Sequence, residues 1–141
     1  MASAPYLIAL TAGFLAQVSK FVAHLVIRRK VNFTRLVATG GMPSAHSASV
    51  TALTTGVAFR EGTQSTLFAV TLFFSLVVMY DAAGLRRAAG SQARILNRIV
   101  EDHYAHRGFL PKRLSELLGH TPFEVFVGAA LGLLYGLVWY M

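Results

Sequence analysis

Four stretches of the chain are almost free of charged residues, and polar segments separate them. They cover about 6–27, 43–59, 66–84 and 122–140. Each is close to the ~20 apolar residues that a helix needs to cross a bilayer. The pattern predicts an all-α integral membrane protein, a single domain over 1–141, with four transmembrane helices packed as a bundle. No positive charge precedes the first stretch, so we expect it to be retained rather than cleaved as a signal peptide.

Small and polar residues recur at helical spacing in two of these stretches. The second carries a row of hydroxyl groups, which favours a position inside the bundle, and the fourth carries a row of glycines. Residues at this spacing let two helices approach closely, so they predict helix packing, and a homo-oligomer through the glycine-rich faces is a further expectation. The residues are Ser44, Ser47, Thr51, Thr54 and Thr55, with Ala48, Ala52 and Gly56 beside them, and Gly128, Gly132 and Gly136.

The basic residues set the expected orientation and partners. The chain has a net charge of +7, yet charged residues make up only 13% of it and hydrophobic residues 55%. The positive charges gather in two polar segments, at 28–35 and 86–113, which the positive-inside rule places in the cytoplasm, with both termini outside. Anionic membrane lipids are then the expected partner, and nucleic acid is not, because basic and aromatic residues are not interleaved. Without cysteine there is no disulfide or thiol chemistry.

The longest polar segment, about 86–119, separates the third and fourth stretches. Leu96, Ile99 and Val100 recur at helical spacing with charged residues opposite, which predicts an amphipathic helix lying on the membrane. A short helix over 111–118, ended by Gly119, is expected to follow. His103 and His106 are the only metal candidates, but no third ligand has matching spacing, so a solvated loop and no metal site are predicted.

The most unusual local sequence is Gly40-Gly41-Met42-Pro43-Ser44-Ala45-His46-Ser47-Ala48. Two glycines allow close approach of the backbone to a ligand, and Pro43 suits the first position of a helix. A helix N-terminus with a hydroxyl and an imidazole beside it favours a bound anion. The stretch therefore indicates a phosphate site. A plain helix cap with a small-residue packing face explains the same pattern equally well.

The predicted topology brings the remaining ionisable residues to the cytoplasmic side. Ionisable groups at membrane depth are costly and are a functional hypothesis by default. Alternatives remain open for each: Lys20 can extend to headgroups, the arginines can be membrane anchors, and Glu124 can serve only in a capping box. The set consists of Lys20 and His24, Ser44 and His46, Asp81, Arg86 and Arg87, and His120 and Glu124.

Three blocks of sequence carry a family resemblance. Pro43-Ser44-Ala45-His46 resembles the Pro-Ser-Gly-His motif of the type 2 phosphatidic acid phosphatases and the vanadium haloperoxidases, and His120-Thr-Pro-Phe-Glu124 resembles their His-x-x-x-Asp motif. Together with YDAAGLRRAAGSQARILN, these blocks are most similar to the divergent phosphatidic-acid-phosphatase-like membrane proteins of bacteria and plastids. The resemblance implies a bacterial inner membrane or a plastid membrane.

The resemblance also implies roles for individual residues. His120 would be the nucleophile that forms a phosphohistidine, Glu124 would orient its ring, and His46 would protonate the leaving oxygen. Ser44, the Gly41 backbone, Lys20 and Arg86 or Arg87 would hold the phosphate, near Asp81. The chain departs from the family pattern in having Ala45 for Gly, Glu124 for Asp, and its arginines more than thirty residues before His120.

The expected function is metal-independent hydrolysis of a lipid phosphate or diphosphate, with no cofactor, at a cytoplasm-facing site. An alternative is a non-catalytic protein that uses the same cationic pocket to bind phospholipid headgroups or scaffold a partner. A third, an ion or proton carrier using Lys20, His24 and His46, is disfavoured because these groups crowd one side and line no path across.

Overall fold

The computed structural model describes residues 4–28, 41–104, 113–114, 116 and 119–141, without the side chains of Ile27, Arg28 and Arg86. All regular secondary structure in these residues is helical, as predicted. The helices are α1 Pro5–Arg28, α2 Ala45–Glu61, α3 Thr66–Ala83, α4 Leu85–Tyr104 and α5 Pro122–Tyr140.

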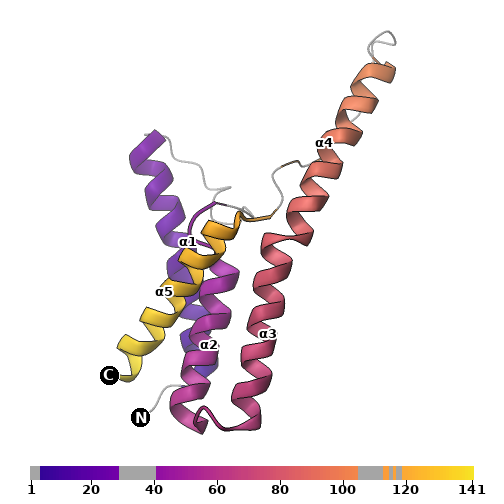
Figure 1. Ribbon diagram of the computed structural model, residues 1–141. Helices are drawn as coiled ribbons and strands as arrows, with labels where there is room; N and C mark the ends of the chain where they lie inside the picture. The colour runs from indigo at the N-terminus through magenta and orange to yellow at the C-terminus, as the bar shows by residue number, and fades with distance from the viewer. Residues whose placement is uncertain (1–3, 29–40, 105–112, 115, 117–118) are drawn as a thin grey trace.

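Helices α1, α2, α3 and α5 form a bundle, and α4 continues from α3 beyond it (Figure 1). The two termini lie at the end of the bundle opposite α4. We call the end where α3 passes into α4 the site end, because all the candidate residues of α1, α2, α3 and α5 lie there. The sequence prediction that these residues share one side of the protein is therefore confirmed for the bundle; the side of the membrane that this end faces stays a prediction.

Three helices are long and apolar enough to cross a membrane among the described residues: α1, the helix beginning at Thr66, and α5. Helix α2, with 17 residues, does not meet this length, so the prediction of four spans is confirmed only in part. Helix α2 packs against α1, α3 and α5, and its hydroxyl-bearing face is buried. Because its neighbours shield it from lipid, α2 can be short and polar.

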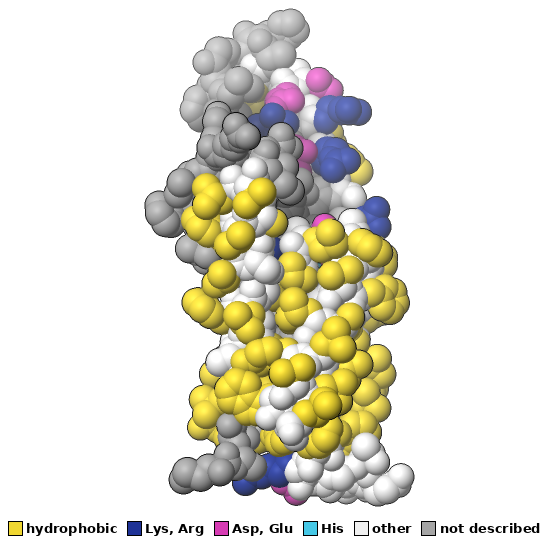
Figure 2. Space-filling view, turned by 90° about the vertical axis from the view of Figure 1, so that its left-hand side faces the viewer, with side chains coloured by type: hydrophobic (Ala, Val, Ile, Leu, Met, Phe, Trp, Pro, Cys, Tyr) yellow, Lys and Arg dark blue, Asp and Glu magenta, His cyan; other side chains and the backbone are white. Residues whose placement is uncertain are grey.

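Large hydrophobic side chains cover the outside of the bundle, and charged side chains gather at its two ends (Figure 2). Phe14, Phe73 and Phe126 are among the most exposed, while the core consists mainly of small residues such as Ala12, Ala48 and Ala52. This inverted arrangement is what a bilayer favours: apolar side chains face lipid, and close helix contacts replace a large hydrophobic core.

The glycine row of α5 packs on α2 within the same chain. A Cβ at Gly128 would overlap the carbonyl oxygen of Ser44, and one at Gly132 would overlap that of Ala48. The packing role predicted for these residues is confirmed. Since each glycine face is already occupied by its neighbour, a homo-oligomer would have to use another surface.

Two local predictions in the polar segment need correction. Helix α4 runs unbroken through His103, which was expected to lie in a solvated loop. Residues 113, 114 and 116 are not helical, so the short helix expected over 111–118 is wrong at these positions, and its other residues lie outside the described chain. Gly119 does make a turn, with φ +87°. Side-chain contacts to α4 hold this segment in place of local helical bonds.

Candidate active site

The start of α5 holds His120 and Glu124 together. Thr121 is the N-cap, and its hydroxyl accepts the Glu124 amide at 3.3 Å, while Oε2 of Glu124 accepts the Thr121 amide at 3.1 Å. The same Oε2 lies 3.1 Å from Nδ1 of His120. Glu124 therefore serves both in the capping box and as a partner of the histidine, the two roles that the sequence left as alternatives.

His120 is 3% exposed and is held at both its backbone and its ring. Its amide donates to the carbonyl of Ala82, near the end of α3, at 2.9 Å. With Nδ1 directed at the carboxylate, the favoured neutral tautomer carries its proton there and leaves a lone pair on Nε2. This is the form in which an imidazole acts as a nucleophile.

His46 lies next to this ring, in the first turn of α2. The centroids of the two imidazoles are 6.4 Å apart, and the rings meet edge to face. His46 is exposed whereas His120 is buried, so one ring is set in the bundle and the other stands at its rim. At this separation both rings can reach one phosphate group.

Helices α2 and α5 lie side by side and parallel, so their N-termini meet at the site end. The amide of Ser44 donates to the carbonyl of Glu124 at 3.1 Å, which ties the two starts together. The N-terminus of a helix has unpaired amides and the positive end of the helix dipole. Two such ends side by side make this corner of the bundle favourable for negative charge.

The structure gives Ser44 a more local role than the sequence suggested. Ser44 is the N-cap of α2 and is fully buried; its Oγ accepts the amide of Ser47 at 3.4 Å and the hydroxyl of Ser47 at 3.1 Å. Pro43, expected at the first helical position, lies two residues before the helix. Gly41 has φ +81° and an exposed backbone, with no atom near the place of a Cβ, so it is open to a ligand.

Lys20 points into the bundle. Ile8, Ala12 and Ala16 form the buried face of α1 at four-residue spacing, and Lys20 continues this row at the site end with 9% exposure. The spacing turns its side chain inward, and its ammonium interacts electrostatically with Glu124. The alternative in which Lys20 extends to lipid headgroups does not match this position.

The other predicted residues lie at the edge of this group. Asp81 is half-buried in the last turn of α3, and His24 is half-buried one turn beyond Lys20. Arg87 is exposed at the start of α4, and Arg86 precedes it, its side chain outside the description. No group of three potential metal ligands occurs in the described residues; His106 lies outside them.

Comparison with known proteins decides the family. The model of the "Divergent PAP2 family" matches residues 1–135, which include every site residue named above. The chain belongs to the divergent PAP2 family. It is also 44% identical to the uncharacterized membrane protein YuiD of Bacillus subtilis (strain 168), over 95% of this chain and 92% of that protein. No solved structure matches it.

The sequence reasoning missed one feature of this divergent PAP2 protein. Asn97 of α4 is 4% exposed; its amide nitrogen donates to the carbonyl of Leu114 (2.9 Å) and to Glu116 (2.8 Å), and its oxygen accepts the Leu114 amide (2.8 Å). We call these bonds the Asn97 latch. The latch holds the segment that leads to His120 against α4. A lone asparagine between apolar positions of an amphipathic helix was the signal.

Proposed function

We propose that this divergent PAP2 protein hydrolyses a lipid phosphate or diphosphate through a phosphohistidine at His120. The observation that supports this most directly is the buried His120, paired with the half-buried Glu124, at the point where two helix N-termini and Lys20 converge. A nucleophile with its orienting carboxylate and a cationic, amide-rich corner are the parts that phosphoryl transfer needs.

The geometry supports a two-step displacement. Nε2 of His120 attacks phosphorus while the bond to the leaving oxygen breaks, and His46 gives that oxygen its proton. Water then attacks the phosphohistidine, His46 takes the proton of the water, and inorganic phosphate leaves with Nε2 of His120 restored. Lys20 and the helix N-termini stabilise the charge on the phosphate oxygens in both steps. Glu124 stabilises the ring of His120 as it becomes positive.

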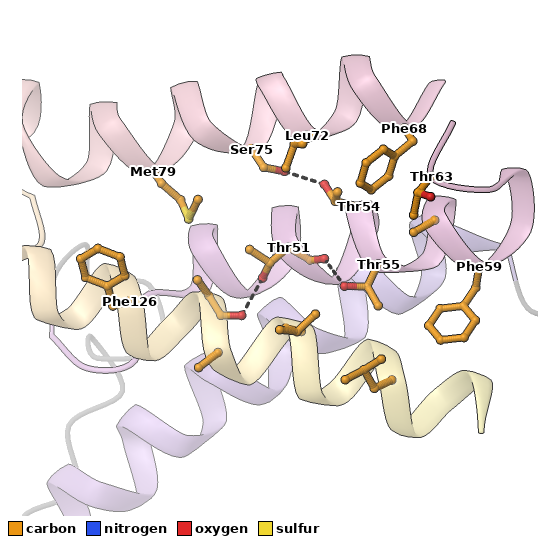
Figure 3. A pocket seen from close by; sticks show the side chains of 15 residues that line it. Thr51, Thr54, Thr55, Phe59, Thr63, Phe68, Leu72, Ser75, Met79 and Phe126 are labelled. Atoms are coloured by element: carbon orange, nitrogen blue, oxygen red, sulfur yellow. Dashed lines mark hydrogen bonds between the residues drawn. The ribbon is translucent and has the colours of Figure 1, made fainter. Parts of the chain in front are cut away.

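A groove between α3 and α5 suits the lipid tail of such a substrate (Figure 3). It measures about 580 Å³, has α2 as its floor, and is lined mainly by apolar atoms. Met79 and Phe126, close in sequence to Asp81 and Glu124, line its site end, and Leu137 lies near its far end. The span from Phe126 to Leu137 is about 16 Å along the helix, similar to the ~15 Å thickness of one bilayer leaflet.

The hydroxyl groups on the floor of the groove are bonded within the protein. Thr54 and Ser75 share a 2.8 Å hydrogen bond, and Ser75 also reaches the carbonyl of Val50. Thr51 bonds the carbonyls of Ser47 and Ala129, and Thr55 that of Thr51. A bonded hydroxyl presents little polarity to a ligand, so the groove fits a hydrocarbon chain better than water or an ion.

We further propose that the site end faces the cytoplasm. The order of the helices puts the basic segments that precede α2 and follow α3 at the site end. The positive-inside rule then favours this end in the cytoplasm, with both termini outside. The substrate would enter from the inner leaflet.

A headgroup-binding protein without turnover remains the second candidate. Two features favour binding without turnover: Ser44 Oγ is already bonded to Ser47, and Glu124 stands where the family has Asp. The cationic corner that would bind a headgroup depends on neither feature. Binding requires Lys20 and the helix N-termini; only hydrolysis requires His120.

The deciding experiment measures phosphate release by the purified protein from a panel of lipid phosphates and diphosphates, beside binding of the same lipids. We expect His120→Gln to abolish release while binding persists, and Lys20→Met to weaken both. The matched control is His103→Gln, an exposed histidine of α4 away from the site. Acid-labile labelling of the wild type by substrate carrying radioactive phosphate would identify the phosphohistidine. Binding without release by any variant, wild type included, would favour the headgroup-binding protein.

A further inference from the structure

Helix α4 presents three different sides. One side, with Ala93 and Asn97 at 7% and 4% exposure, is covered by the segment around Leu114. A second side carries Arg94 and Glu101, whose charges pair with that segment at Glu116 and Arg113. Because these two sides are occupied, only the third side of α4 remains available to a partner.

The third side is apolar apart from the exposed Gln92 and His103, and no described residue covers it. Ile95, Leu96 and Ile99 are 62%, 49% and 58% exposed, and Leu85 lies on the same side at 70%. We call these four residues the α4 stripe. Helix α4 leaves the bundle (Figure 1), and an exposed apolar stripe along such a helix indicates a binding surface.

Charge identifies the partner. Arg87 and Arg98 are exposed on one flank of the stripe together with the carboxylate of Asp102, and no ion pair with another described residue engages either arginine, whereas Arg94 and Arg113 are paired. A helix with an apolar stripe and free arginines along its flank suits an anionic lipid surface: the stripe enters the boundary of headgroups and acyl chains, and the arginines reach lipid phosphates. Two copies of α4 meeting at their stripes would instead bring these like charges together.

Position supports the same partner. A single residue lies between the end of α3 and the start of α4. Helix α3 is apolar enough to cross the membrane, so the first turn of α4 lies at the membrane surface. Gly84 separates the two helices, and a Cβ there would lie 3.2 Å from the carbonyl oxygen of Tyr80. A glycine at this junction tolerates the backbone change that a corner requires.

We propose that α4 is a surface arm: on the membrane it tilts about Gly84 and lays the α4 stripe onto the anionic leaflet, with Arg87 and Arg98 against the lipid phosphates. The Asn97 latch keeps the segment around Leu114 on the arm, on the side away from the stripe. The arm does not depend on hydrolysis or headgroup binding at His120.

The absence of cysteine allows single-site labelling. Ile99→Cys places an environment-sensitive fluorophore on the stripe, and Ser91→Cys places it on the exposed polar flank. Each is reconstituted at one chain per nanodisc, in phosphatidylcholine alone or with phosphatidylglycerol. In the anionic discs we expect iodide to quench the probe at position 99 at least threefold less than the probe at 91. The difference should shrink in phosphatidylcholine, and in anionic discs when Arg98→Glu is added. Arg60→Glu, the same charge change at the opposite end of the bundle, should leave it intact.

Equal quenching at 99 and 91 in anionic discs would overturn the proposal, as would protection that is independent of lipid charge. Protection of position 99 that appears only when two chains share a disc would overturn it in favour of a second copy as the partner. Because the readout is probe accessibility, these results do not depend on whether the protein hydrolyses phosphate.

Discussion

At the scale of single residues, Glu124 joins a structural role to a chemical one. Its Oε2 accepts from the Thr121 amide and lies against the His120 ring at the same distance, 3.1 Å. The alternative that the sequence offered, a capping box alone, is therefore true but incomplete. Substitutions that keep one role and remove the other can separate them.

Glu124→Gln keeps an oxygen for the cap but removes the charge that supports a positive His120. We expect phosphate release to fall by about 10²-fold or more, because the change from carboxylate to amide in a serine-protease triad costs about 10⁴-fold, with little loss of stability. Glu124→Ala should lose as much activity and also about 1 kcal/mol of stability, since the cap is lost. Activity and thermal unfolding in detergent measure the two effects. Equal destabilisation by both variants would contradict this separation.

Glu116 is the titratable residue of the Asn97 latch. The hydrogen bond from Asn97 is the main cause that lowers the pKa of Glu116 from its usual 4.5, and the charges of Arg113 and Arg94 add to it. A carboxyl with a lowered pKa in the folded protein stabilises above its usual pKa and loses that contribution as pH falls through the lowered value.

We therefore expect the latch to weaken as the pH falls below 4.5, the usual pKa of this carboxyl, and through the lowered pKa of Glu116, and to be insensitive to pH well above 4.5. Hydrogen exchange at the Leu114 amide, corrected for the intrinsic rate, should show this as a loss of protection on acidification. Glu116→Gln should remove the pH dependence, and Asn97→Ala should remove the protection at every pH. Protection that persists unchanged to pH 3 in the wild type would be inconsistent with this account.

At the scale of helices, the parallel contact of α2 with α5 depends on the absence of side chains at three glycines. At Gly132 a Cβ would overlap both the carbonyl of Ala48 and the hydroxyl of Thr51. The overlap involves backbone, which cannot rotate away.

Gly132→Ala should therefore destabilise the bundle by about 1–3 kcal/mol, the usual cost of overpacking, and should reduce phosphate release because the N-termini of the two helices separate. Unfolding by sodium dodecyl sulfate is the measurement. The matched control is Ala69→Val, which adds bulk at an exposed position of α3 and should change stability little. A neutral Gly132→Ala would show that α2 and α5 are not packed this closely.

At the scale of the whole molecule, the groove between α3 and α5 is the proposed place for the lipid tail. Ala58 lies on its lining near the end away from the site, together with Phe59 and Thr63. A bulky side chain there should shorten the space for a tail without touching His120 or Lys20.

For Ala58→Phe we expect long-chain lipid phosphates to bind several-fold more weakly while short-chain ones bind as in the wild type. Native mass spectrometry with lipids of graded chain length measures this preference. The control is Thr66→Val, at the exposed start of α3. Gly62→Ala also lies near but outside the groove lining, but the φ of +81° at Gly62 would add backbone strain. Uniform weakening at all chain lengths would argue against a tail in this groove.

Periodicity was sufficient to predict the bounds of the four bundle helices to within about two residues and to place the candidate groups on one side, whereas the extent of α4 and the short helix expected over 111–118 were predicted wrongly where the structure describes them. Lys20, His46, His120 and Glu124 could be selected from sequence because ionisable groups are rare in membrane-spanning helices. The prediction of a helix start at Pro43 was wrong because Ser44 caps α2 with its own hydroxyl. Such a boundary depends on side-chain geometry rather than on periodicity.

By itself, the sequence determined the helical class, the membrane setting, the family motifs and the end of the bundle that holds the candidate residues, because hydropathy and local spacing are properties of consecutive residues. Only the tertiary structure decided which helices enclose α2, that Glu124 serves both Thr121 and His120, and that Asn97 joins α4 to the segment around Leu114. These features depend on which surfaces meet when distant segments pack, and that choice is made by the complementarity of the whole bundle.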